Sequence, residues 1–368
     1  MWAFLQLPAL VTLLEVTRTV CVSDNGCVQA GPESPEDQDF FLQLALHLDA
    51  PSTEEVQHLV SLLLVARKEC PKATEACLPA LSELRLAVWP HVQAETNSSF
   101  LPWMPSGHLD NVADEDTQGG GVSSTRSMFY RHVFKAAGIN TWANLHQVTK
   151  DFYRAPYAAT CKHFHLVDAT RRTAFAFVRD PISRFISGYS ELEYRSRAAI
   201  GWPKLENLSQ ALQGHPVGSP ERAAAFFIEF LQTGIENNGH VRPQIEFFLP
   251  VGGCSIPMDF IGRTEHLPDD WVKMFALQNE TVPPFDNALA THFHDHRDRK
   301  SMESFLGLAR ADNSTETSAP HTGSRYLRAL CWLFLADFAV FQYEIPNECQ
   351  QEPMKSVLAL VRKASKAS

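Results

Sequence analysis

Apolar residues recur every three or four positions in the first part of the chain. They do so over residues 38–92, in the successive stretches "DQDFFLQLALHLDA", "STEEVQHLVSLLLVARKEC" and "CLPALSELRLAVWPHV". This spacing is that of amphipathic helices. Ser52, with Glu55 three positions later, has the pattern of a helix-capping box. The pattern predicts an N-terminal helical region, a small hairpin or bundle.

A polar, Gly/Ser-rich stretch follows at residues 93–125 and is typical of a linker. From residue 126 the period changes, and apolar runs alternate with helical patterns. Strands are predicted in "SMFYRHVF", "CKHFHLVD", "RRTAFAFVRD" and "MDFIGRTEHL", with helices between and after them. Such alternation predicts an α/β domain at 126–345, a three-layer and mostly parallel sheet with ligands at the carboxyl ends of its strands. Residues 346–368 are expected to form a C-terminal tail.

The amino end carries an apolar run at residues 2–14, shorter than the ~20 residues of a membrane-spanning helix. It is typical of a signal peptide within residues 1–23, although a short signal anchor or a first amphipathic helix also fits. Any membrane attachment is expected through this segment alone. Four N-glycosylation triplets favour the same secretory route; they begin at Asn97, Asn207, Asn279 and Asn313.

Composition narrows the range of functions. The formal net charge is −10, and this argues against a nucleic-acid-binding protein, whose surface would be basic. Any site for an anion must therefore be local. The eight cysteines include two close pairs, Cys21/Cys27 and Cys70/Cys77, which could be disulfides in an oxidising compartment. None has the CxxC spacing of a zinc site.

A local anion site is indicated by "FVRDPISRFISGY" at residues 177–189. Here a buried strand runs into a helix, with Asp180 as the expected cap and Pro181 at the first position. Arg179 and Arg184 crowd this junction together with Ser183 and Ser187, which lie one turn apart. Cationic side chains and hydroxyls beside a helix amino end suit a phosphate-like group.

A second candidate anion site follows the first strand of the α/β domain, in "FKAAGINTW". Lys135 offers a positive charge, Gly138 allows backbone N–H groups to approach a ligand, and Asn140 and Thr141 add polar groups. The order GxxxxGK[ST] of the Walker loop is absent. Two anion sites suggest a ligand that carries phosphate at two ends.

Four blocks of the sequence resemble the Golgi carbohydrate sulfotransferases, including the HNK-1/chondroitin group and the uronyl 2-O-sulfotransferases. "FVRDPISRFISGY" is similar to their RDPxxRxxSxY pattern, and "FKAAGINTW" looks like their loop PKVACTNW. The stretch at 240–271 resembles HWxPQ…DFIGKFE…D, and "LCWLFLADFAVFQYE" resembles the closing YxxDFxxFxY helix. The resemblance implies a P-loop-like sulfotransferase fold. It also implies that the protein is located in the Golgi lumen or is secreted. It also implies transfer of a sulfonate from 3′-phosphoadenosine 5′-phosphosulfate to a glycan hydroxyl, which needs no metal.

The resemblance also implies roles for individual residues. Arg179 and Ser187 would bind the 3′-phosphate of the donor. The 5′-phosphosulfate would be held by the first loop, through Lys135, Gly138, Asn140 and Thr141. Phe134 stands where the family has proline, and Gly138 and Ile139 replace Cys-Thr. Lys135 is retained and would offset charge on the departing phosphate.

A general base must accept the proton of the acceptor hydroxyl. His163 and His165 are the leading candidates, because alternation along a strand places them on one face and the uronyl 2-O-sulfotransferases carry a similar HxH. Glu191 and His132 are the next candidates. His240 and Arg242 are expected to line the acceptor or donor cleft, or else to be structural.

Other interpretations remain open for two features. In "HFHDHRDRK" at 292–300 the alternate histidines could bind a metal, although a solvated loop fits better, and its basic residues could contact an anionic glycan. For the whole chain, the alternatives to a sulfotransferase are a glycan-binding protein that keeps the fold without the activity, and a P-loop nucleotide kinase. The kinase is disfavoured by the missing Walker order.

Overall fold

The computed structural model divides the chain into two compact units, residues 1–52 and 53–368. The residues that it describes are 19–21, 27–29, 54–105, 120–155, 164, 173–198, 205–250, 255–282, 284–286, 296–308 and 322–367. In the first unit, strands β1 (Thr19–Cys21) and β2 (Cys27–Gln29) pair antiparallel, with Cys21 opposite Cys27. The predicted signal segment before Thr19 and the predicted helix at 38–50 lie outside the described residues.

A five-stranded sheet organises the second unit, in the order β5-β3-β4-β6-β7. Its members are β3 (Gly120–Ser123), β4 (Met128–Arg131), β5 (Tyr153–Ala155), β6 (Thr173–Val178) and β7 (Phe260–Arg263). Strands β4, β6 and β7 are parallel, whereas β3 pairs antiparallel with β4 and β5. The predicted α/β architecture is confirmed. The predicted strand at 161–168 lies outside the described residues except for Phe164.

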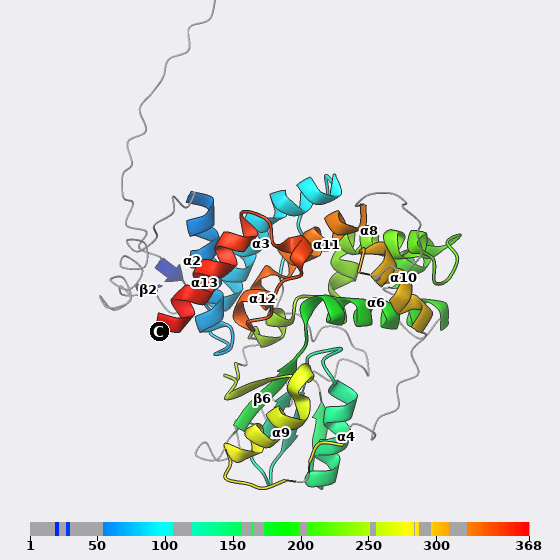
Figure 1. Ribbon diagram of the computed structural model, residues 1–368. Coiled ribbons are helices and arrows are strands. Elements are labelled where there is room, and N and C mark those ends of the chain that lie inside the picture. The colour runs from blue at the N-terminus through cyan, green and yellow to red at the C-terminus, as the bar shows by residue number, and fades with distance from the viewer. Residues whose placement is uncertain are drawn as a thin grey trace, which may run out of the picture. The chain divides into compact units, whose positions relative to one another are not determined.

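Both faces of the interior strand β6 are covered, which explains why its sequence is a continuous apolar run. Phe175 and Phe177 pack on one face with residues of α4 (Gly138–Val148) and α9 (Leu267–Ala276), the helices that flank the sheet in Figure 1. Ala174 points to the opposite face, into a cluster with Phe164. All six residues of β6 are buried.

Strand β3 occupies residues that the sequence analysis placed in the linker at 93–125. Its Gly-Gly-Val-Ser sequence has no apolar alternation, yet all four residues are buried. A Cβ atom at Gly121 would lie 2.3 Å from the ring of Trp142 and 2.5 Å from that of Phe152. The aromatic packing on the sheet therefore requires a glycine at this position. In the sequence alone, such a glycine cannot be told from the glycines of a linker.

The N-terminal helices do not stand apart from the α/β domain. Helix α2 (Glu54–Glu69) and helix α3 (Cys77–Thr96) pack against each other as predicted. Helix α3 also packs against α11 (Thr322–Leu333), and α2 packs against α12 (Leu335–Val340) and α13 (Met354–Ala367). The segment at 346–368, expected to be a tail, is therefore largely a packed helix, with Val357 and Val361 fully buried.

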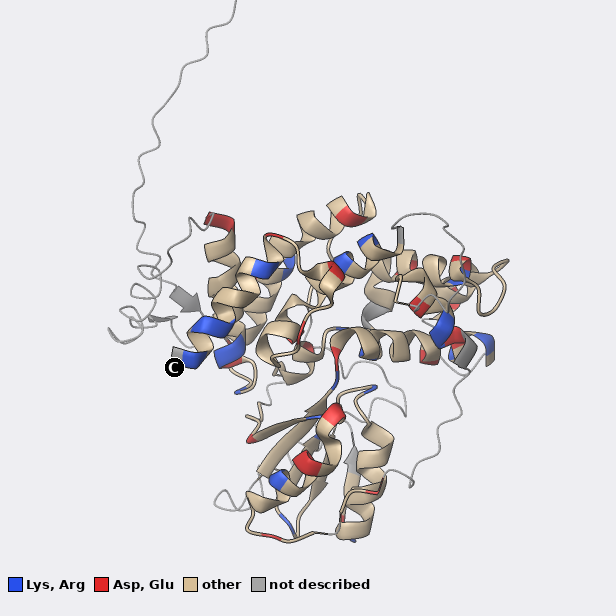
Figure 2. Cartoon of the chain, in the orientation of Figure 1, with Lys and Arg blue, Asp and Glu red and all other residues tan. Residues whose placement is uncertain are grey.

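The remaining helices connect these parts. They are α6 (Pro181–Ala198), α7 (Glu206–Leu212), α8 (Pro220–Asn237), η3 (Gln244–Phe248), η4 (Thr264–His266), α10 (His296–Phe305) and η6 (Asn347–Cys349). No described helix is long and apolar enough to cross a membrane. Basic and acidic residues are interspersed along the helices in Figure 2. Binding of an anion must therefore depend on a few local side chains and not on a surface that is basic throughout.

Two disulfides link described cysteines. Cys70–Cys77 joins the end of α2 to the start of α3, which confirms the pairing that their spacing suggested. Cys331–Cys349 joins α11 to η6 and was not predicted.

Candidate functional site

The three parallel strands end at the same edge of the sheet, and the segments that follow them carry most of the candidate residues. Lys135 lies beyond β4, Arg179 directly follows β6, and Glu265 follows β7. Ligands of α/β sheets bind at this edge. The Nη1 atom of Arg179 lies 3.5 Å from the backbone oxygen of Lys135, so the first two segments are in contact.

The loop after β4 has a strained backbone. Lys135 and Ala137 have φ angles of 64° and 56°, in the left-handed region that non-glycine residues rarely adopt. Helix α4 begins directly afterwards, and no side chain caps its first turn. Strain of this kind is typical of ligand-binding loops, and uncapped N–H groups at a helix amino end attract anions.

Gly138 has a packing role beside the donor-binding role predicted for it, which stays a prediction. A Cβ atom there would lie 2.0 Å from Nε2 of His132, so the glycine leaves room for the His132 imidazole. The adjacent Asn140 and Thr141 hold buried oxygens, Oδ1 and Oγ1, that have no hydrogen-bond partner among the described residues. Thr141 is fully buried. Orphaned polar atoms at an uncapped helix start are consistent with a polar ligand here.

The junction between β6 and α6 has the predicted local structure. Helix α6 begins at Pro181, and the backbone N–H of Ser183 donates a hydrogen bond to Asp180 Oδ1 at 2.8 Å. Ser187 lies half-buried on this helix. The Gln244 side chain holds the backbone of Arg179 from both sides, accepting from its N–H at 2.8 Å and donating to its oxygen at 2.6 Å.

Arg184 is not part of an anion site. Its side chain is fully buried, and it donates hydrogen bonds to the backbone oxygens of Phe134, Gly239 and Arg242. These contacts fasten the loop after β4 to the segment before η3. Arg184 therefore stabilises the backbone of the segments that carry the site.

Arg242 makes structural contacts, and its predicted place in the acceptor or donor cleft stays a prediction. It is fully buried and forms an ion pair with Glu246, which also pairs with Arg85. Next to it, the buried carboxylate of Asp337 accepts the backbone N–H groups of Gln244 and Ile245, at 2.8 and 2.9 Å. These hydrogen bonds fix the start of η3 and, through Gln244, the position of Arg179.

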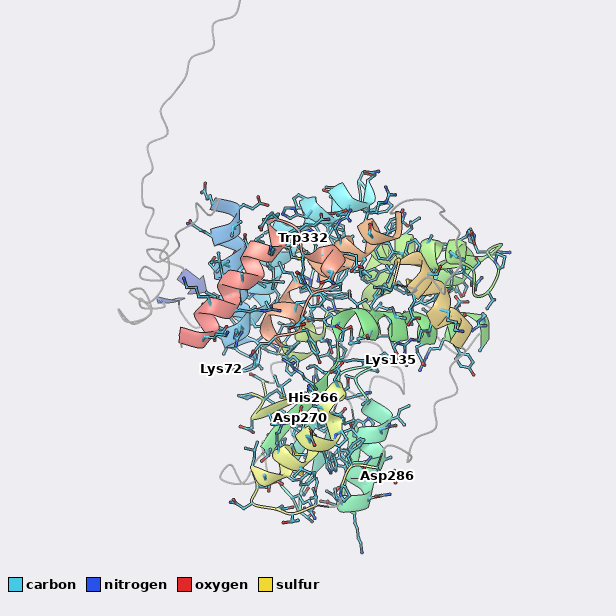
Figure 3. The ribbon with its side chains drawn as sticks, viewed as in Figure 1. Lys72, Lys135, His266, Asp270, Asp286 and Trp332 are labelled. Carbon is cyan, nitrogen blue, oxygen red and sulfur yellow. A yellow bond between two sulfur atoms is a disulfide. The ribbon has the colours of Figure 1, made fainter. Side chains whose placement is uncertain are left out.

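Three side chains from two other segments surround Lys135, which Figure 3 labels where α6 meets the sheet. Lys135 Nζ lies 3.1 Å from Glu191 Oε2, and Arg195 Nε lies 2.7 Å from the other oxygen of the same carboxylate. His240 is buried beside them, with Nδ1 2.8 Å from Asn238 Oδ1. Burial, together with the positive charge of Lys135, holds the pKa of His240 well below its usual range, so this imidazole is neutral.

The environment of Glu191 makes it a poor general base. Burial by itself raises the pKa of this carboxyl, but the charges of Lys135 and Arg195 oppose burial and bring the pKa to about 2. A carboxylate with so low a pKa has little tendency to accept a proton near neutrality. Glu191 is therefore better understood as a partner of Lys135 than as the base.

This ion pair predicts how stability responds to acid. The pKa of Glu191 is about 2 in the folded chain against 4.5 in the unfolded chain, so its contribution is complete above pH 4.5 and is lost as the pH falls toward 2. Between pH 5 and pH 3 the wild type should lose more unfolding free energy than Glu191→Gln, by about 2 kcal/mol. Urea denaturation at the two pH values measures this difference; parallel losses in both proteins would contradict it.

Several predicted residues lie outside the described part of the chain. They include both leading base candidates, His163 and His165; Phe164, between them, is buried against Phe129 of β4. His292 and His294 are outside it as well. Among the described residues, no group of three His, Cys, Asp or Glu side chains could hold a metal ion.

A hollow of about 410 Å³ adjoins the start of α6. Its lining includes Asp180 and Ser183 of the β6–α6 junction and Arg299 and Glu303 of α10. Arg299 belongs to the basic stretch noted in the sequence, and its Nε pairs with Glu303 Oε1 at 2.7 Å. The volume lies in the range of small-ligand sites.

Comparison with models of protein families gives a match to the sulfotransferase family over residues 121–344. The match covers more than half of the chain, so the protein belongs to the sulfotransferase family, whose chemistry is sulfonyl transfer. This confirms the sulfotransferase assignment made from the four sequence blocks, and the Golgi carbohydrate subtype stays a prediction. Searches of curated proteins and of solved structures gave no match.

Sequence reasoning missed three residues that build the site: Gln244, Glu265 and Asp337. Gln244 and Glu265 stand in the third sequence block and Asp337 stands in the fourth, and this position was the available signal. Glu265 accepts the backbone N–H of Asp180 at 2.8 Å and the hydroxyl of Tyr343 at 3.0 Å, and thereby joins β7 to the β6–α6 junction. The block marked this residue, but its partners lie in segments about 80 residues away in the chain and could not be read from the block.

Proposed function

We propose that this protein transfers a sulfonate group from 3′-phosphoadenosine 5′-phosphosulfate to a hydroxyl group of a glycan. The observation that carries the proposal is the meeting of two anion-binding features at one sheet edge. The strained loop of Lys135 with the uncapped start of α4 lies against Arg179 at the start of α6. A donor with phosphate groups at both ends needs two such features close together.

The two features would divide the donor between them. Lys135, the N–H groups at the start of α4, Asn140 and Thr141 would hold the 5′-phosphosulfate, and Arg179 with Ser187 would hold the 3′-phosphate. The Lys135 ammonium would offset the negative charge that develops on the departing phosphate. By analogy with phosphoryl transfer, positioning and charge stabilisation supply most of the rate.

The hollow beside α6 supports a sugar acceptor. It adjoins the junction that carries Arg179, and it is lined by polar side chains as well as by Ile182 and Ile186. Its polar side chains, Asp180, Ser183, Arg299 and Glu303, can form hydrogen bonds with sugar hydroxyl groups.

Arg179 offers a direct test of the donor site. Arg179→Ala should weaken binding of 3′-phosphoadenosine 5′-phosphate by roughly ten- to a hundredfold, because a charge-assisted contact is worth ~1.5–3 kcal/mol. The fold should persist, since Gln244 holds the backbone at this position rather than the side chain. Calorimetric titration measures the affinity, with Arg328→Ala on α11 as a matched control. Unchanged affinity in the folded Arg179 variant would remove this residue from the donor site.

The proposed function as a whole is tested by two measurements on the wild-type chain. Calorimetry with 3′-phosphoadenosine 5′-phosphate tests donor binding, and transfer of labelled sulfonate to a panel of glycans tests the reaction. Binding with transfer supports the proposal. Binding of glycans without transfer would support the alternative of an inactive glycan-binding protein, and absence of nucleotide binding would reject the donor.

We also propose that the protein works in the secretory pathway, in the Golgi lumen or after secretion. Three of the four glycosylation triplets have an exposed asparagine, namely Asn97, Asn207 and Asn279; Asn313 is outside the described residues. The chain made in a glycosylating host should therefore migrate faster on a gel after N-glycanase treatment. Unchanged migration, with all cysteines alkylated without prior reduction, would contradict this location.

A further inference from the structure

The Lys135 ammonium lies in an environment that would ordinarily disfavour its charge. Its side chain is 12% exposed, and burial lowers the pKa of a lysine because the charged form loses its hydration. Two further cations, Arg195 and Arg179, act on it in the same direction. A neutral amine could not attract the phosphosulfate that the proposed function brings to this loop.

In the part of the chain that the structure describes, the Glu191 carboxylate opposes these effects. Glu191 Oε2 lies 3.1 Å from Lys135 Nζ, and the charge and hydrogen bond of Glu191 raise the pKa of the ammonium. The other oxygen of this carboxylate accepts from Arg195 Nε at 2.7 Å, so its orientation is fixed from the opposite side. Among the described residues, His240 also faces this cluster, beside Arg195 and Arg179, and it is neutral and therefore supplies no counter-charge.

The backbone makes the arrangement specific. Lys135 has a left-handed φ of 64°, so the direction in which its side chain leaves the loop is constrained. Glu191 lies on α6, and the Arg184 side chain of the same helix fastens α6 to the backbone oxygen of Phe134, the residue before Lys135. The loop and the helix are thus held at a fixed position relative to each other, and this keeps the Glu191 carboxylate next to the Lys135 ammonium.

We propose that Glu191 is a positioning residue that keeps the Lys135 ammonium protonated and held at the edge of the donor loop. The purpose of this role, to present a charged lysine to the donor, rests on the proposed function. The role itself is a property of the donor-free protein. Glu191 acts through Lys135 and does not accept the acceptor proton.

The proposal makes opposite predictions for the two neighbours of Lys135. Glu191→Gln removes the counter-charge, so the pKa of Lys135 should fall by about one unit or more. Arg195→Gln removes a like charge and leaves the carboxylate, so the pKa of Lys135 should rise. Glu95→Gln, which breaks an ion pair with Arg328 far from this cluster, is the matched control and should leave the Lys135 pKa unchanged.

The experiment is an NMR titration of the full chain labelled with ¹³Cε-lysine, with the Lys135 signal assigned by its loss in Lys135→Arg. It needs neither donor nor activity, so its result is separate from that of the proposed function. A fall in Glu191→Gln with a rise in Arg195→Gln supports the role. An unchanged Lys135 pKa in Glu191→Gln, or a fall in both variants as general loosening would produce, overturns it.

Two additions keep the test decisive. Should Glu191→Gln fail to fold, Glu191→Asp withdraws the carboxylate from Nζ, and a smaller fall in the Lys135 pKa is expected; no fall overturns the role. If the chain also transfers sulfonate, the alkaline limb of kcat/KM should move down with the Lys135 pKa in Glu191→Gln. A limb that stays in place while the Lys135 pKa falls would show that the proposed use of Lys135, and not its pairing with Glu191, is wrong.

Discussion

Lys135→Ala is expected to lower the turnover of sulfonate transfer by about 10²–10³, the usual loss when one group that stabilises transition-state charge is removed. Binding of 3′-phosphoadenosine 5′-phosphate should weaken far less, by about tenfold or less, because the desulfated nucleotide still meets Arg179 and the uncapped start of α4. The asymmetry follows from the role proposed for Lys135, which is to offset charge that appears only as the phosphate departs. Steady-state kinetics and calorimetry on the same preparation measure the two losses.

The structure indicates that this variant will fold. Removing Lys135 leaves Glu191 paired with Arg195, so no buried carboxylate is left alone. Lys273→Ala is a suitable control, because Lys273 pairs with Asp270 on the surface of α9, away from the site. If turnover and nucleotide affinity fall by the same factor, Lys135 contributes simple binding and the transition-state role is wrong.

The parts of the site that sequence predicted are those with a local cause. The β6–α6 junction was recognised because an apolar run, a capping Asp180 and Pro181 stand side by side in the chain, and each acts on its neighbours. Helices α2 and α3 followed from the spacing of their apolar residues. Local chemistry of this kind can be read from one sequence.

The parts that were missed depend on distant packing. Strand β3 was assigned to a linker because its glycines resemble those of a linker. Gly121 is in fact required by contact with the ring of Trp142, which is 21 positions away in the chain. Helix α13 was taken for a tail, although Met354, Val357 and Leu358 have helical spacing. Arg184 was placed with the anion site, since its three backbone acceptors lie in segments about 50 residues away in either direction.

The same limit applies to Glu191. The sequence offered it as an alternative base, because a carboxylate near an anion site is a reasonable candidate. Its two cationic neighbours, Lys135 and Arg195, lower its pKa and make it a poor base. Lys135 comes from a different segment of the chain, so this effect could not be read from the local sequence. Because Glu191 is held in this ion pair and His240 is buried, the leading candidates for the base are still His163 and His165, the histidines that flank Phe164.

His163→Ala and His165→Ala are expected to divide into one variant that loses about 10²–10⁴ in turnover and one that does not, because one histidine serves as the general base. Imidazole suits this role, since its ordinary pKa of about 6.5 leaves it partly unprotonated at near-neutral pH. Binding of 3′-phosphoadenosine 5′-phosphate should remain nearly intact in both variants. A histidine that only supports the fold would instead lower the thermal midpoint and weaken nucleotide binding together with turnover.

The assignment can be sharpened by the pH dependence of kcat/KM. A true base produces an acidic limb near its own pKa, and the variant that lacks it should lose this limb as well as most of the rate. His58→Ala, an exposed histidine on α2, is the matched control and should keep the wild-type profile. Wild-type rates in both His163→Ala and His165→Ala would reject the pair. His132 would then be the next candidate, because its imidazole packs against Gly138 at the start of α4 and so lies beside the proposed phosphosulfate loop.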